Sequence, residues 1–159
     1  MTTPRLPSLA AGELALWHAF KQAGESVRAA VGEEIARATG LSDPDFGILT
    51  RLADAGGSMR QNELAASMGW QRSRLSHQLT RMQTRGLVVR ADPPAAVRGV
   101  TVEITDAGRA AAVSARPVHA VAVRRHLLDR LPVEDFPRLI EVLSQLAQAS
   151  AQPPFRNPG

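Results

Sequence analysis

The chain of 159 residues contains no cysteine, a single lysine, few aromatic residues and no long apolar segment. Without cysteine it can form neither a disulfide scaffold nor a thiol redox switch nor a cysteine-ligated zinc finger. No apolar run approaches the roughly 20 residues that cross a bilayer. The N-terminal segment "MTTPRLPSLAAGEL" also lacks the apolar core of a secretory signal. We expect a cytoplasmic globular protein, with one domain or two small lobes that share a core.

The positive charge of the chain is concentrated in one region. The net charge is +4, and between residues 60 and 98 seven arginines face only two acids, Glu63 and Asp92. The remainder is nearly neutral, with twelve basic and thirteen acidic residues. A local excess of this kind indicates an anionic partner, and nucleic acid is favoured over a membrane surface. The preference for arginine over lysine can reflect genome composition, so the inference rests on the clustering.

The N-terminal part of the chain shows the periodicity of helices. From about residue 9 to 39 apolar side chains recur at helical spacing and predict one long helix that ends at Gly40. Its apolar stripe consists of Leu16, Phe20, Val27, Val31 and Ile35. The segment "SDPDFGILTRLADAGG" predicts a second helix, with Asp43 as its cap and Pro44 at the first helical position.

Two further helices are predicted between residues 58 and 86. A brief one begins at "SMRQ", where Ser58 and Gln61 have the spacing of a capping box, and ends at Gly69. The next covers about residues 71–85. On a helical wheel its Leu79 and Met82 fall within about 40° of Leu75. The opposite side carries polar residues that can form hydrogen bonds, namely Ser73, His77, Thr80 and Thr84.

The segments "LVVRA" and "VTVEI" are β-branched and partly alternating, and they predict a hairpin. Its loop, "DPPAAVRG", is long and stiffened by two prolines. Thr105 is expected to cap a helix over about 105–130 that Pro117 kinks or splits. A last helix follows, with Pro137 in its first turn and one apolar side formed by Phe136, Leu139, Ile140, Leu143 and Leu146. Residues 151–159 are expected to be disordered.

The predicted fold is mainly α with a small β-hairpin, in the arrangement of a winged helix-turn-helix. Because a DNA major groove admits one helix, the helix at 71–85 would bury its apolar side and present polar groups and cations to DNA. The expected DNA-contacting residues of this helix are Arg72, Ser73, Arg74, Ser76, His77, Thr80 and Arg81. The alternative for the arginines is a solvated helix face. Arg85 lies near the helix end, away from the groove, and Trp70 suits packing or a phosphate contact better than base reading.

The runs "NELAASMG", "SRLSHQLTRMQTRGLVVR" and "RGVTVEITDAGR" resemble, in order and spacing, the MarR family of bacterial transcriptional regulators. The resemblance spans about residues 12–148 and includes the opening of the helix after the wing, from Ile104 to Gly108. It implies a homodimer of triangular outline. Residues 1–40 and 117–150 would form long flanking dimerisation helices, and residues 41–116 the winged helix-turn-helix.

The resemblance also assigns roles in the wing. Family members carry Asp-x-Arg there, with the arginine in the minor groove, and counting back from Thr105 places this arginine at Arg98. The position of the aspartate is taken by Ala96, a departure from the family pattern. Since the acid helps to hold the arginine in place, the order of the wing and its share of the affinity are in question, and Asp92 is a possible substitute.

The resemblance further implies release of DNA by small aromatic, often anionic, effectors. Trp17, His18 and Phe46 come from the segments that would wall such a pocket, and Trp17 beside His18 suits an aromatic carboxylate. The alternative for these residues is ordinary core or dimer packing. No metal, other cofactor or catalysis is expected, because His119 and His126 stand seven residues apart without further ligands and no nucleophile elbow exists.

The sequence therefore predicts a ligand-responsive repressor that binds a pseudo-palindromic DNA operator, with half-sites one helical turn, about 34 Å, apart. Two alternatives stay open. One is an architectural DNA-binding protein without an effector. The other is a fold of this kind that binds a protein or small molecule and no DNA.

Overall fold

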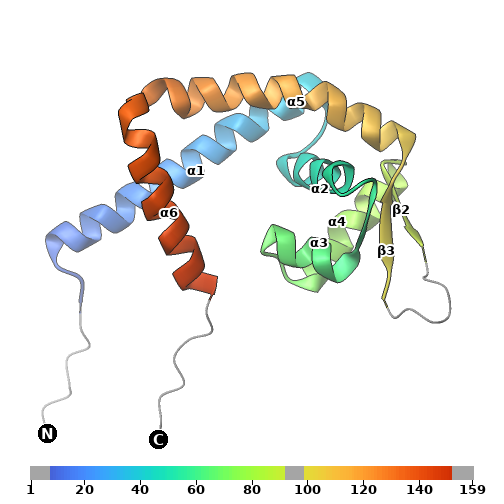
Figure 1. Ribbon diagram of the computed structural model, residues 1–159, viewed down its shortest axis with the longest axis horizontal. Coiled ribbons are helices and arrows are strands. Elements are labelled where there is room, and N and C mark those ends of the chain that lie inside the picture. Colours follow the sequence, from blue (N-terminus) through green and yellow to red (C-terminus); the bar gives the residue numbers. More distant parts are fainter. Residues whose placement is uncertain (1–7, 92–98, 152–159) are drawn as a thin grey trace, which may run out of the picture.

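The computed structural model describes residues 8–91 and 99–151, and two long helices that lie side by side form its framework (Figure 1). These are α1 (Ala11–Thr39) and α5 (Asp106–His126). The predicted long helix is confirmed, and Gly40 ends it in the left-handed conformation at a φ of 74°, which glycine adopts without steric cost. Val31 and Ile35 are buried, whereas the N-terminal half of α1 is exposed. The predicted apolar stripe is thus covered only in its C-terminal half.

The second helix, α2 (Asp43–Asp54), is capped by Ser42 and not by the predicted Asp43. The Ser42 hydroxyl accepts a hydrogen bond from the Asp45 backbone N–H at 3.2 Å, and Asp45 Oδ2 accepts one from the Ser42 N–H at 2.9 Å. This reciprocal pair satisfies two amides at the helix start, and an acid three residues further on is available only to Ser42. Asp43 and Pro44 lie in the first turn.

The lobe beneath the long helices contains α2, α3 (Gln61–Met68), α4 (Arg72–Thr84) and a small antiparallel sheet (Figure 1). The sheet has the strand order β1 (Ser58–Arg60), β3 (Thr101–Ile104), β2 (Val88–Ala91). The predicted hairpin of β2 and β3 is confirmed. The predicted capping box at Ser58 is wrong, because Ser58–Arg60 forms a strand in which Met59 pairs with Val102. This cross-strand partner lies far along the chain and leaves no signal in the local sequence.

A single core joins the lobe to the long helices. In the lobe, fully buried side chains come from α2, α3, α4 and the sheet, namely Ile48, Leu49, Leu52, Leu64, Leu75, Leu79, Met82, Val88 and Val102. They are continuous with Val31 and Ile35 of α1 and with Ala112, Ala115 and Ala122 of α5. Since protein cores are close-packed, this continuity fixes α4 relative to the long helices.

The start of α5 explains the Thr-x-x-Gly pattern in the sequence. Thr105 caps the helix as predicted: its hydroxyl accepts from the Gly108 N–H at 3.0 Å and donates to the Gly86 carbonyl at 2.6 Å. A Cβ atom at Gly108 would lie 2.1 Å from the carbonyl oxygen of Leu87. Only glycine therefore lets the first turn of α5 lie against the segment that follows α4.

The C-terminal elements differ in part from the prediction. α5 is not split at Pro117 and ends at His126; Ala115 and Ala122 anchor it in the core on both sides of the proline. Two short 3-10 turns, Leu128–Arg130 and Val133–Asp135, lead to α6 (Phe136–Ala151). The predicted last helix is thus confirmed, with Pro137 in its first turn. It turns away from the end of α5 beside the N-terminal half of α1 (Figure 1).

The apolar residues Ile140, Leu143 and Leu146 of α6 are exposed. Of the tail predicted to be disordered, Ala151 still belongs to α6, and 152–159 lie outside the described residues. Among the described helices, none combines the length and the apolar character of a membrane span.

Candidate nucleic-acid interface

α3 and α4 form a helix-turn-helix whose second helix has two distinct sides. Gly69 ends α3 in the left-handed conformation at a φ of 64°, and α4 begins at Arg72. Leu75, Leu79 and Met82 are fully buried, as the helical wheel predicted. The lobe holds α4 by this side, which leaves the other side to solvent.

The open side of α4 is cationic. Arg72, Arg74 and Arg81 are exposed, and no ion pair in residues 8–91 and 99–151 neutralises them. The polar DNA-contact candidates between them are Ser73, His77 and Thr80, which are exposed, and Ser76, which is half-buried. α4 itself contains no acidic residue. Guanidinium groups only donate hydrogen bonds, so this side of the helix suits phosphates and the acceptor edge of guanine.

Trp70, just before α4, organises one of these arginines. The guanidinium carbon of Arg74 lies 4.0 Å from the centroid of the Trp70 ring. Trp70 is half-buried and packs against the core, so the contact is a cation–π interaction on a fixed platform. The stacked guanidinium keeps its N–H groups in its own plane, where they can reach a phosphate. The structure thus agrees with the packing role expected for Trp70.

Arg90, on β2, was not among the predicted site residues, yet it reaches across to α4. Its Nη2 donates to Thr80 Oγ1 at 2.6 Å, its Nε to Gln83 Oε1 at 3.1 Å and its Nη1 to Ser76 Oγ at 3.5 Å. The wing strand and α4 are therefore joined by one guanidinium. The alternation of β2 gave only the strand face of Arg90, which it shares with the buried Val88, and not its partners on α4.

The contact with Arg90 changes what Thr80 can do. Thr80 Oγ1 also donates to the Ser76 backbone carbonyl at 3.0 Å. A hydroxyl has one proton to donate, so in this arrangement the Thr80 proton is in use and one acceptor site is occupied by Arg90. Its methyl group and the second acceptor site of its hydroxyl are the parts of Thr80 that these contacts leave open.

Arg85 faces away from the open side of α4, as the sequence indicated. Its Nη1 lies 2.6 Å from Asp45 Oδ2, and its Nη2 donates to the Gly40 carbonyl at 3.0 Å. Asp45 is buried. Burial raises its pKa, but the hydrogen bonds from Ser42 and the Arg85 guanidinium outweigh this effect, so the pKa of the Asp45 carboxyl lies below its usual value.

The predicted minor-groove contact cannot be placed. Arg98 lies outside the described residues, together with Ala96 and Asp92, which bear on the missing wing aspartate. The described part of the wing consists of β2, β3 and Gly99–Val100.

The three effector-pocket candidates are not brought together within one chain. Phe46 is buried on α2, with its ring 4.8 Å from that of His119. Trp17 and His18 lie in the exposed half of α1, where Trp17 stacks on Phe20. Asp43, in the first turn of α2, lies against Gly32 of α1. Gly32 is roughly four helical turns, about 22 Å, further along α1 than Trp17. Trp17 is therefore far from α2 and from Phe46 in the same chain.

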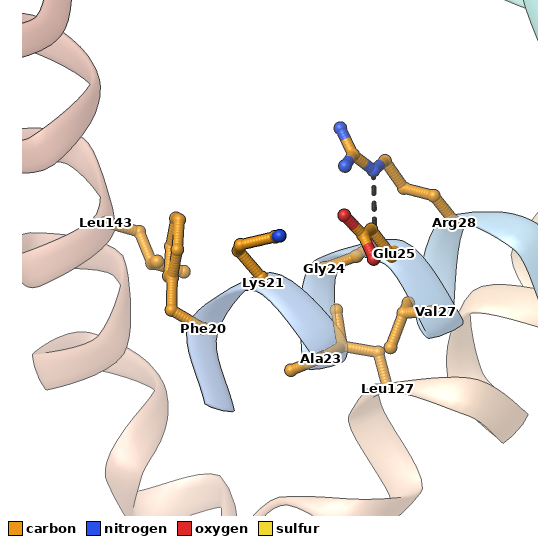
Figure 2. A pocket seen from close by; sticks show the side chains of 9 residues that line it. All are labelled: Phe20, Lys21, Ala23, Gly24, Glu25, Val27, Arg28, Leu127 and Leu143. Atoms are coloured by element: carbon orange, nitrogen blue, oxygen red, sulfur yellow. Dashed lines mark hydrogen bonds between the residues drawn. The ribbon is translucent and has the colours of Figure 1, made fainter. Parts of the chain in front are cut away.

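An apolar groove of about 480 Å³ lies between α1, the end of α5 and α6 (Figure 2). Its apolar walls include Phe20 and Val27 of α1, Leu127 directly after α5, and Leu143 of α6. Lys21, Glu25 and Arg28 supply charged groups. None of the three predicted effector residues lines it. In Figure 2 the side chains of Phe20 and Leu143 stand next to each other across the groove.

The two histidines of α5 have structural contacts. His119 packs on Phe46, and His126 Nε2 lies 2.6 Å from Glu34 Oε1, which also accepts from Arg125 at 2.9 Å. The hydrogen bond from His126 and the Arg125 charge lower the pKa of Glu34 despite partial burial. Within the described residues, no group of three or more His, Cys, Asp or Glu is placed to hold a metal ion.

Comparison with known proteins identifies the class of this fold. The structure is similar to AbsC, a MarR family transcriptional regulator from Streptomyces coelicolor, with a TM-score of 0.83 and 30% identity over 90% of this chain and 97% of that one. It is also similar to Sco3205, a MarR family regulator from the same organism solved in complex with DNA, with a TM-score of 0.85 and 30% identity over 96% and 95% of the two chains. These are winged helix-turn-helix regulators.

A further similar structure is the transcriptional repressor CouR bound to a 23-mer DNA duplex, with a TM-score of 0.74 and 29% identity over 89% of this chain and 99% of that one. The sequence model of the MarR family matches residues 39–99. No curated protein matches the sequence. The chain belongs to the MarR family of transcriptional regulators, which are DNA-binding proteins and not enzymes.

Proposed function

We propose that the chain is a cytoplasmic, homodimeric repressor that binds a pseudo-palindromic operator and releases it when a small aromatic effector binds. The observation that carries the proposal is the division of α4. Its apolar residues Leu75, Leu79 and Met82 are completely enclosed, while Arg72, Arg74 and Arg81 are exposed and, in the part of the chain that the structure describes, have no acidic partner. A helix that is anchored in the core by its apolar side and carries cations on its exposed side suits insertion into the major groove.

Each residue of the open side has a distinct proposed role. Arg72, Arg74 and Arg81 contact phosphates or guanine edges, and the exposed Ser73 and His77 read base edges in the early turns of α4. Ser76 and Thr80 act together with Arg90, which binds both hydroxyls. Arg98 enters the minor groove from the wing.

The homodimer would cover the apolar side chains that one chain leaves exposed. Leu16, Trp17 and Phe20 of α1 are 73%, 50% and 51% exposed, and Ile140, Leu143 and Leu146 of α6 are similarly open. Apolar surface of this kind marks an interface. We therefore assign residues 1–40 and 117–150 to dimerisation and residues 41–116 to the winged helix-turn-helix, with the groove of Figure 2 receiving part of the second copy.

The proposed regulation follows from the geometry of a dimer. Two recognition helices bind successive major grooves only when they are about 34 Å apart. An effector that favours another separation of the lobes weakens operator binding without touching DNA. A preference of a few kcal/mol for that state changes occupancy by orders of magnitude.

The effector site is proposed to lie between the dimerisation helices and the winged lobe, with Phe46 of one protomer and Trp17 and His18 contributed by its partner. The separation of Trp17 from Phe46 within one chain motivates this arrangement. One regulator of similar fold, 18% identical to this chain, is described as organohalide-sensing and has a structure bound to 2,4-dichlorophenol.

Binding to DNA is tested by fluorescence anisotropy with promoter and random duplexes across a salt series. We expect nanomolar affinity for the operator and a steep loss as salt rises. Because the bound dimer carries two copies of each arginine, the double variant Arg74→Ala, Arg81→Ala should reduce the slope of log K against log salt by about 3.6. Arg116→Ala, which removes an exposed arginine of α5 paired with Asp54, tests the loss of a positive charge outside α4 and should behave as wild type.

Two results would change the proposal. Equal affinity for operator and random duplex would indicate the architectural alternative, and unchanged DNA binding by the double variant would exclude α4 as the recognition helix. The effector is tested by a thermal-shift screen of aromatic acids with and without operator DNA. We expect hits that raise the melting temperature of the free protein and release DNA. A screen in which no compound alters either property would indicate a regulator without such an effector.

A further inference from the structure

Asp45 is a buried carboxylate that joins α2 to two points of α4. Only 2% of it is exposed. Oδ2 accepts hydrogen bonds from the Ser42 N–H at the start of α2 and from Arg85 at the end of α4. Oδ1 accepts from Gln78 Nε2, in the middle of α4, at 2.7 Å. A buried charge is costly unless it is hydrogen-bonded throughout, and both oxygens of this carboxylate are engaged.

The carboxylate fixes the orientation of Gln78. Gln78 is 6% exposed, and its amide has one donating and one accepting end. Because an ionised carboxylate only accepts, the NH₂ group of Gln78 must face Asp45, and its Oε1 must face the other way. There it accepts a hydrogen bond from Arg81 Nη2. Asp45, Gln78 and Arg81 thus form a directed relay in which each group determines the next.

We propose that Asp45 is a positioning residue for operator binding, which through the amide of Gln78 holds the Arg81 guanidinium at the DNA-facing side of α4. The proposal rests on the DNA-binding role of α4 given above. Arg81 uses one N–H group on Gln78 and keeps the others for a phosphate. A long side chain that is held in one geometry before binding loses less conformational freedom when it meets the phosphate.

Asp45→Asn gives a specific expectation, because asparagine has one accepting oxygen where aspartate has two. The Arg85 cation and the Ser42 N–H both compete for this oxygen, so the NH₂ group of the introduced asparagine would turn to Gln78. The Gln78 amide would then flip and present its own NH₂ to Arg81. Two donors repel, and Arg81 would lose its anchor although it stays in the sequence.

The test measures operator affinity and its salt dependence for the full-length protein. Asp45→Asn should weaken binding to about the same degree as Arg81→Ala, within about twofold, and lower the salt slope of the dimer by about 1.8, or about 0.9 for each protomer. In the Arg81→Ala background the same change should have no further effect. Arg85→Met serves as the control for stability: it removes an Asp45 partner but leaves the relay, so it should lower the melting temperature and keep the wild-type slope.

Rescue distinguishes positioning from simple packing. In the double variant Asp45→Asn, Gln78→Glu, the NH₂ group of the introduced asparagine can donate to the introduced glutamate. The second oxygen of that glutamate accepts from Arg81 and holds it again, so operator affinity should recover relative to Asp45→Asn, with a lower salt slope than the wild type because the new carboxylate offsets the Arg81 charge. If Asp45→Asn does not fold, Gln78→Met, which leaves Arg81 without an acceptor, should show the same loss of slope.

One result overturns the relay: the wild type binds the operator, Arg81→Ala binds it more weakly, and Asp45→Asn or Gln78→Met binds it with the salt slope of the wild type. The relay is also overturned if Asp45→Asn and Arg81→Ala have additive effects, or if the Asp45→Asn, Gln78→Glu variant binds the operator no more tightly than Asp45→Asn. The proposed function itself fails by a separate result, when the wild type does not bind DNA at all.

Discussion

Arg90 and Thr80 are hydrogen-bonded across 2.6 Å, and this contact joins the first strand of the wing to α4, the helix proposed to enter the major groove. The two residues lie on different elements, and the same guanidinium reaches Ser76 and Gln83. The open side of α4 is therefore shaped by a residue from outside the helix. A change at Arg90 is expected to act on sequence preference more than on stability.

For Arg90→Lys we predict reduced discrimination between the operator and its point variants, with the salt slope retained. Lysine keeps the charge but lacks the planar fork that binds two hydroxyls. Arg90→Ala should in addition lower the slope if this residue also meets a phosphate. Anisotropy titrations on a panel of single-base variants measure both effects. Wild-type discrimination by Arg90→Lys would show that the contact with Thr80 has no part in reading the operator.

Gly108→Ala is predicted to destabilise the fold by about 3 kcal/mol or more, because the added Cβ would meet the Leu87 carbonyl oxygen at 2.1 Å. The matched control is Gly12→Ala in α1, where a Cβ meets nothing within 4 Å and helix propensity favours alanine by up to about 1 kcal/mol. Denaturant unfolding of both variants measures the difference. Similar stabilities for the two would contradict the close approach of α5 to the segment after α4.

Acidification should destabilise the protein in part through Asp45. Its pKa in the folded state lies below the usual value, so its stabilisation is complete above the unfolded-state pKa of about 3.9 and is lost as the pH falls through the lower folded-state value. Melting temperatures of wild type and Asp45→Asn between pH 7 and pH 3 should therefore differ by a constant amount down to about pH 4 and begin to draw together below it. A constant difference over this range would assign the effect of the variant to packing alone.

Leu143→Glu is predicted to give a monomer that binds operator DNA far more weakly. Leu143 lines the apolar groove with Phe20 and is 52% exposed in the single chain, and a buried carboxylate at the interface would be strongly unfavourable. Ser144→Glu, which adds the same charge at the neighbouring exposed position of α6, should remain dimeric. Sedimentation velocity distinguishes the two. A dimeric Leu143→Glu would remove the groove from the proposed interface.

The helices and the hairpin were predictable from the sequence because their signals are local. Periodic apolar residues, glycine at Gly40 and Gly69 and the cap at Thr105 determine most boundaries. The strand at Ser58–Arg60 was missed, since only its pairing with β3 makes it a strand. Pro117 did not split α5, because packing on both sides of the proline outweighs one missing hydrogen bond.

The cationic side of α4 was also predictable, but the contacts that organise it were not. Gln78 lies three positions after Leu75, within about 60° of it on the wheel, which was a signal for burial; its partner Asp45 is 33 residues away. Arg90 was counted as one charge in a basic region. Its contact with Thr80 depends on how the hairpin packs against α4, which residue spacing does not give.

The central claim is that α4 of each protomer enters successive major grooves of one operator. Selection of bound duplexes from a random-sequence library, followed by hydroxyl-radical footprinting on the enriched sequence, tests it most directly. We predict an inverted repeat whose half-site centres lie about 10 base pairs apart. The wild type should protect both half-sites, and the Arg74→Ala, Arg81→Ala variant should protect neither. Enrichment of no sequence, or protection that the double variant retains, would contradict the claim.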